Sequence, residues 1–136
     1  MTKTFRSEEQ QYRFNFPYQC GTGCELPHKA FDNEHEVVPG RDFVIMGTDG
    51  LFDNLYDKDI HGCLLPSVKA IKEKKDEFEL IDPEKVANCM AQKAYNLSKV
   101  RNYMSPFSQG AVKAGKRHIG GKEDDITVIV TQIIRK

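Results

Sequence analysis

Hydrophobic residues recur at two spacings along the chain, and these spacings predict strands near both ends. Aromatic residues alternate with polar ones over 12–16, which is typical of a half-buried strand. The nearly continuous apolar run 42–46 predicts a second strand, paired as a hairpin with 35–38 across a Pro39-Gly40 turn. The β-branched residues within 126–134 predict the last strand.

The middle of the chain follows the helical spacing instead. Apolar residues recur every three or four positions over 60–71, with an interruption at Pro66. Asp82 and Pro83 predict a helix start, because aspartate caps the free N–H groups and proline fits the first helical position. A short helix is expected near 107–114. Strands and helices in this order predict an α+β fold in one unit.

Composition narrows the classes of function. The chain has 136 residues, of which 39% are hydrophobic and 29% charged, as in a folded domain of moderate size. No apolar run approaches the roughly 20 residues of a membrane helix, and no secretory signal begins the sequence. The formal net charge is +0, whereas nucleic-acid-binding proteins usually carry a basic surplus. We therefore expect an intracellular protein with neither a membrane nor a nucleic-acid partner.

Two smaller features leave alternatives open. The four cysteines are scattered, so reduced thiols are expected, although Cys20, Cys24 and His28 are also spaced loosely like part of a zinc site. Residues 86–122 contain seven basic side chains and no acidic one. This run either attracts a phosphorylated substrate or, as we favour, forms an ordinary solvated surface that includes Lys122.

Carboxylates lie at the ends of two strongly apolar strands. Asp49 follows the strand at 42–46, and Asp124 and Asp125 precede the last strand. If these strands are antiparallel neighbours, Asp49 and Asp124 face each other, and a hard divalent cation would relieve their repulsion. Gly50 and the Gly120-Gly121 pair would let the backbone approach closely. The competing interpretation is a turn and a solvated loop.

Four sequence strings bear on this choice. The strings at 46–54 and 120–130 resemble two motifs of the protein phosphatase 2C family, the metal-dependent serine/threonine phosphatases. Those at 6–19 and 102–109 resemble the branch typified by the T-cell-activation, or mitochondrial-matrix, phosphatase. The resemblance implies an α+β fold that forms part of a two-sheet antiparallel β-sandwich flanked by helices. It also implies that residues 1–136 are the C-terminal portion of that domain and lack its N-terminal half.

The resemblance assigns roles residue by residue. Asp49 and Asp124 match catalytic metal ligands, and Asp53 matches an acidic position linked to a weaker third metal. Asp125 matches a supporting position, beside Gly50. Two Mg²⁺ or Mn²⁺ ions would then activate the water that attacks phosphoserine or phosphothreonine in a phosphoprotein substrate.

The sequence also departs from the family pattern. The family's Asp-Gly-x-Gly-Gly motif, whose aspartate bridges both metals, does not occur in these 136 residues. We therefore expect weak or no activity from the chain alone, with a separate N-terminal half as a partner. The alternative is a catalytically incomplete fragment or pseudophosphatase that acts as a binding module. The resembled branch also makes a mitochondrial location one expectation.

Overall fold

A computed structural model describes residues 3–24, 26–74 and 76–134. The chain divides into two compact units, Met1–Glu36 and Val37–Lys136. No proline-, glycine- or serine-rich linker marks this division, which is why the sequence pattern predicted a single unit.

The N-terminal unit contains a small hairpin. Strand β1 (Gln11–Arg13) pairs antiparallel with β2 (Phe16–Pro17). The prediction of one continuous strand over 12–16 was wrong, because the chain reverses at Asn15, which has a φ of 61°. Asparagine tolerates this left-handed conformation better than most residues. The short 3₁₀ helix η1 (Pro27–Lys29) is the other regular element described in this unit.

The second unit is organised around one pair of strands. Strand β3 (Phe43–Gly47) pairs antiparallel with β6 (Val128–Gln132), with Phe43 opposite Gln132 and Gly47 opposite Val128. The predicted hairpin between 35–38 and 42–46 was wrong, since 35–38 form no strand. The distant, longer β-branched segment pairs with β3 instead, as the packing of its side chains favours.

The region after β3 alternates between helix and strand. Helix α1 (Asp49–Phe52) is a single turn, and α2 (Asp57–Leu64) runs into the 3₁₀ helix η2 (Leu65–Ser67). A second hairpin, β4 (Val68–Ala70) with β5 (Phe78–Leu80), follows. The predicted helix over 60–71 is therefore helical only in its first part. The α-helix ends at Leu64, ahead of Pro66, and the β-branched Val68 begins a strand after the 3₁₀ turn.

The two later helices match their predictions. Helix α3 (Pro83–Ser98) is capped by Asp82, whose carboxylate accepts the Lys85 N–H at 2.9 Å. Helix α4 (Pro106–Lys113) begins after Ser105, whose hydroxyl accepts the Ser108 N–H at 3.0 Å. Every helix in the described part of the chain is too short or too polar to cross a membrane.

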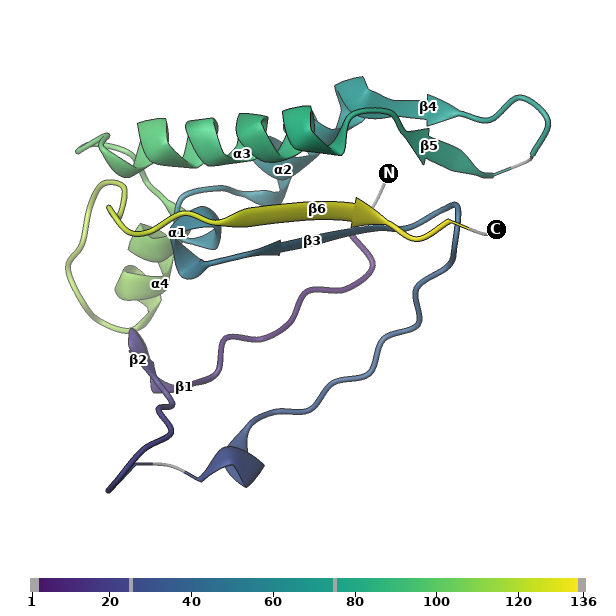
Figure 1. The fold of residues 1–136 in the computed structure, drawn as a ribbon. Helices are drawn as coiled ribbons and strands as arrows, with labels where there is room; N and C mark the ends of the chain where they lie inside the picture. The colour runs from purple at the N-terminus through teal and green to yellow at the C-terminus, as the bar shows by residue number, and fades with distance from the viewer. Residues whose placement is uncertain (1–2, 25, 75, 135–136) are drawn as a thin grey trace. The chain divides into compact units, whose positions relative to one another are not determined.

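The core of the second unit lies between the helices and one face of the β3–β6 pair. Helix α3 packs against β6, and α2 packs against α3 (Figure 1). The core residues alternate along each strand or recur at helical spacing, as amphipathic elements require. They are Leu51, Leu55, Ile60, Cys63, Leu64, Val86, Met90 and Ala94, with Phe43, Ile45, Val128 and Val130 packed against them. The opposite sheet face leaves Met46 and Ile129 about half exposed. Antiparallel strand pairs with packed helices confirm the predicted α+β class.

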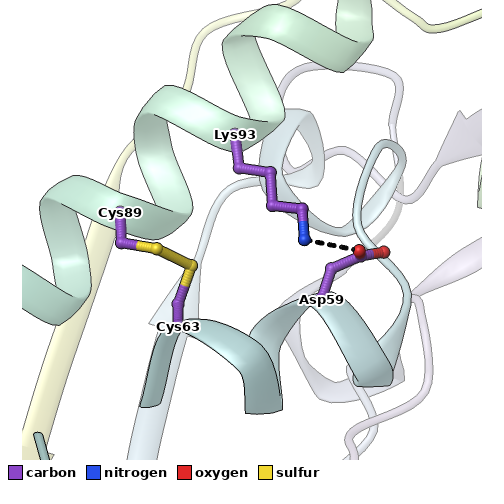
Figure 2. The surroundings of a disulfide bond; sticks show 4 residues. All are labelled: Asp59, Cys63, Cys89 and Lys93. Carbon is purple, nitrogen blue, oxygen red and sulfur yellow. Dashed lines mark ion pairs between the residues drawn. A yellow bond between two sulfur atoms is a disulfide. The ribbon is translucent and has the colours of Figure 1, made fainter. Parts of the chain in front are cut away.

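Two cross-links join α2 to α3. Figure 2 shows a disulfide between Cys63 and Cys89 beside an ion pair between Asp59 and Lys93. The Lys93 Nζ lies 2.7 Å from the Asp59 carboxylate. Asp59 and Cys63 lie four residues apart on α2, and Cys89 and Lys93 lie four residues apart on α3. One face of each helix therefore carries both cross-links. The expectation of reduced thiols was therefore wrong for these two cysteines, while Cys20 and Cys24 are free and exposed.

Reduction of this disulfide is expected to destabilise the second unit by about 3 kcal/mol, because the bond restricts the unfolded chain across a separation of 26 residues. Urea unfolding with and without a dithiol reductant measures the effect. A Cys20→Ser/Cys24→Ser double variant is the control and should retain the full effect of the reductant. A midpoint unaffected by reductant would contradict the prediction.

Candidate functional site

The two predicted carboxylates lie at neighbouring ends of β3 and β6. Asp49 is the first residue of α1, separated from the end of β3 by Thr48, and Asp124 lies in the segment that leads into β6. Because the strands are antiparallel, the end of β3 at Gly47 lies opposite the start of β6 at Val128. The two carboxylates therefore reach the same point, where an oxygen of each lies 3.0 Å from the Lys122 Nζ. The antiparallel arrangement on which the sequence argument depended is confirmed.

Asp53 joins the same group from the end of α1. Its carboxylate lies 2.7 Å from the Lys122 Nζ and is only 10% exposed, against 61% for Asp49 and 37% for Asp124. Three carboxylates thus surround one ammonium. We call Asp49, Asp53 and Asp124 the acidic cluster, and Lys122 is the lysine that binds it.

The charges in this group influence one another. Burial disfavours the charged form of Lys122, but hydrogen bonds to Asp53, Asp124 and Asp49 outweigh it, and the pKa of Lys122 is raised. The Lys122 hydrogen bond, together with the N–H of Asp125, lowers the pKa of Asp124. Both shifts favour the charged forms, so Lys122 and Asp124 stay ion-paired around neutral pH.

Asn54 fixes the loop that carries Lys122. This side chain is fully buried. Its amide Nδ2 donates to the Lys122 carbonyl at 2.8 Å and to the Gly50 carbonyl at 2.9 Å, while its Oδ1 accepts the Lys122 N–H at 2.9 Å. One side chain therefore ties α1 to a segment 68 residues further along the chain.

Ser105 and Ser108 hold the start of the same loop. Both hydroxyls are buried and donate to the Gly120 carbonyl, at 2.7 and 2.8 Å. Gly120 has a φ of +115°, a conformation that other residues rarely adopt. A Cβ on Gly121 would lie 2.2 Å from the Leu97 carbonyl oxygen. The prediction that this glycine pair permits close backbone approach is confirmed.

Gly50 and Thr48 join the end of β3 to the residues before β6. A Cβ on Gly50 would lie 2.5 Å from the Asp125 carbonyl oxygen, so glycine is required there. The Thr48 hydroxyl donates to that same carbonyl at 2.7 Å and accepts the Thr127 N–H at 3.1 Å. The contacts of Asp125 with its neighbours here run through its main chain, while its side chain is exposed.

Sequence reasoning missed three residues of this site. Lys122 was counted among the solvated basic residues, yet its side chain is 18% exposed and bound to three carboxylates. Asn54 and Thr48 were not singled out, although they stand at the end and near the start of the 46–54 string. Their polar side chains beside an apolar strand end were the available signal.

The donor chemistry of the acidic cluster fits a hard divalent cation. Carboxylate oxygens are the ligands that Mg²⁺ and Mn²⁺ prefer, and three of them already converge on one cationic atom. These oxygens lie 2.7–3.0 Å from the Lys122 Nζ, which are hydrogen-bond distances suited to an ammonium. As placed, no three His, Cys, Asp or Glu residues in 3–24, 26–74 and 76–134 form a group that could hold a metal ion. Cys20, Cys24 and His28 are among the described residues that form no such group.

Comparison with known proteins gives consistent relatives. No protein-family model matches the chain. It is 41% identical over 131 residues to the probable protein phosphatase 2C 55 of Arabidopsis thaliana, covering 95% of this chain and 26% of that protein. It is 37% identical over 135 residues to the human protein phosphatase PTC7 homolog, covering 93% of this chain and 41% of that protein. The chain therefore spans well under half the length of these relatives.

A solved structure shows the same similarity. The photosystem II phosphatase PBCP matches with a TM-score of 0.75 and 26% identity, over 96% of this chain and 51% of that one. The fold is thus that of about half of the matched phosphatase chain. Sequence and fold together show that this chain resembles, over nearly its whole length, one part of the protein phosphatases of the 2C type.

Proposed function

We propose that this chain supplies part of the metal site of a protein serine/threonine phosphatase of the 2C type. The observation that carries the proposal is the convergence of Asp49, Asp53 and Asp124 from two distant segments on one cationic atom. The sequence similarity to phosphatases of this type supports it independently.

Each residue has a defined task in this proposal. Asp49 and Asp124 would hold divalent cations through their carboxylate oxygens, and Asp53 would contribute to a weaker site. Gly50 and the main chain of Asp125 keep the two ligand segments in contact. When bound, Mg²⁺ or Mn²⁺ would acidify a water molecule and neutralise charge on the phosphoryl group of a phosphoprotein substrate.

In this proposal the metal site is completed by protein beyond these 136 residues. The β3–β6 sheet has two strands within the described residues, and its outer face leaves Met46 and Ile129 exposed. The Asp-Gly-x-Gly-Gly motif does not occur in the sequence. Both observations favour a site completed by an additional segment such as the N-terminal half of a relative. They equally support the second candidate, a binding module without turnover.

Manganese-dependent hydrolysis of a small aryl phosphate tests the proposal. We expect little hydrolysis from the chain alone, and hydrolysis when the N-terminal half of a relative is added. Asp49→Asn should then lower the rate by about 100-fold or more, because a lost ligand removes several kcal/mol of transition-state stabilisation. Asp32→Asn, which changes an exposed carboxylate in the other unit, is the control and should leave the rate unchanged.

Three other results would each contradict a different part of this proposal: the need for a second half, the role of the metal, or turnover itself. Strong manganese-dependent turnover by the chain alone, lost in Asp49→Asn, would contradict the need for a second half. Hydrolysis that Asp49→Asn leaves intact would contradict the metal role. Stable association of the two halves without any hydrolysis would favour the binding module.

A further inference from the structure

The Lys122 ammonium occupies the centre of the acidic cluster. Its Nζ lies 2.7 Å from Asp53 and 3.0 Å from both Asp49 and Asp124. Most of the side chain is shielded from solvent, and the ammonium also lies 5.0 Å from the centre of the Phe107 ring. An ion pair held in this way is screened less than a pair on the open surface.

The main chain keeps the ammonium near the cluster. The buried Asn54 amide binds both the N–H and the carbonyl of Lys122. The preceding Gly121 is packed directly against the backbone of α3 at Leu97. The lysine backbone is therefore fixed, and only the rotatable side chain can leave the carboxylates.

This arrangement conflicts with simultaneous metal binding. Divalent cations of this class take carboxylate oxygens at about 2.1 Å, much closer than an ammonium does. The Lys122 Nζ contacts one oxygen of each of the three carboxylates. A metal ion on those oxygens would stand beside a like charge in a partly desolvated place, which is unfavourable.

Building on the function proposed above, we propose that Lys122 is a tethered counter-cation that competes with divalent metal for Asp49, Asp53 and Asp124. In the metal-free chain it neutralises part of the cluster's negative charge and holds the three carboxylates together. When metal binds, the side chain swings away while its backbone stays in place. Lys122 is thus a positioning residue that sets the metal concentration at which the site is filled.

The competition is tested by measuring Mn²⁺ binding to the full chain, with the electron paramagnetic resonance signal of free Mn²⁺ as the readout. Lys122→Met keeps the length of the side chain and removes the charge. The dissociation constant of Mn²⁺ from this variant should therefore be about tenfold or more lower than from the original chain. Lys122→Arg keeps the charge and should bind within a few-fold of the original chain. Lys113→Met removes an exposed positive charge from the end of α4 and controls for net charge.

A second measurement needs no variant, and so remains informative if Lys122→Met does not fold. Acetylation of lysines by an amine-reactive reagent is followed by mass spectrometry with and without Mn²⁺. Lys122 should react slowly without metal and faster with Mn²⁺, whereas Lys113 should react at the same rate in both.

The outcomes distinguish this inference from the proposed function. Equal or weaker Mn²⁺ binding by a folded Lys122→Met, or unchanged Lys122 acetylation while Mn²⁺ is bound, would overturn the competition and leave the metal site standing. Absence of Mn²⁺ binding in the original chain and in both Lys122 variants would overturn the competition, whereas the proposed function is overturned by the hydrolysis measurement with the added N-terminal half.

Discussion

Replacing Gly121 with alanine is expected to destabilise the second unit by about 3 kcal/mol or more, the upper end of the cost of overpacking. The added Cβ would lie 2.2 Å from the Leu97 carbonyl oxygen and 2.4 Å from the Ser98 Cα. Both are main-chain atoms of α3, so no side-chain rotation relieves the clash. The loop must move away from the helix, which also disturbs the hydrogen bonds at Gly120.

Urea unfolding measures this effect, and the chain offers a matched control. Gly62 lies within α2, and a Cβ there would meet nothing within 4 Å. Gly62→Ala should therefore be neutral or stabilising by up to about 1 kcal/mol, because alanine is the better helix former. Equal unfolding midpoints for the two variants would show that the close approach at Gly121 is not required.

Replacing Asn54 with alanine is expected to cost about 3–4 kcal/mol of stability. The substitution removes three hydrogen bonds from a fully buried side chain. It leaves the Gly50 carbonyl and both main-chain groups of Lys122 without that partner, and each unsatisfied buried group costs about 1–3 kcal/mol. The loop bearing Lys122 should also loosen, so its amide should exchange with solvent faster.

Asn96→Ala provides the control for this second prediction. Asn96 is exposed on α3 and accepts one hydrogen bond from Gln92 at 3.0 Å. Its loss should change stability by no more than about 0.5 kcal/mol, as is usual for surface positions. If Asn54→Ala cost no more than this control, the buried amide would not be what joins the two segments.

Elements defined by their own residues could be predicted from the sequence. Helix α3 follows from Asp82, Pro83 and an apolar face of regular spacing, all within one short window. The meeting of Asp49 and Asp124 was also predictable, but only on the condition that their strands are antiparallel neighbours. The pattern identified both strands as apolar and left their pairing open, because alternation reports which face is buried and not which strand lies alongside.

Features that depend on distant contacts were mispredicted or missed. The hairpin at 35–38 was the natural local choice, yet β6, far along the chain, provides the better partner for β3. Cys63 and Cys89 face each other only once α2 and α3 have packed. Lys122 is an ordinary basic residue in the sequence, and its environment arises from folding alone. In each case the deciding interaction lies outside any local window.

The pairing of β3 with β6 has a kinetic consequence. Phe43 and Gln132 lie near opposite ends of the unit's sequence but are paired in the sheet. The chain must therefore lose the entropy of closing a very long loop before this pairing can stabilise the fold. Such high contact order makes folding slow, whereas α2, α3 and the β4–β5 hairpin are made of nearby residues. The carboxylates of the acidic cluster therefore come together in the slow step. A spectroscopic probe placed beside Lys122 would consequently report completion of folding, later than any signal from the helices.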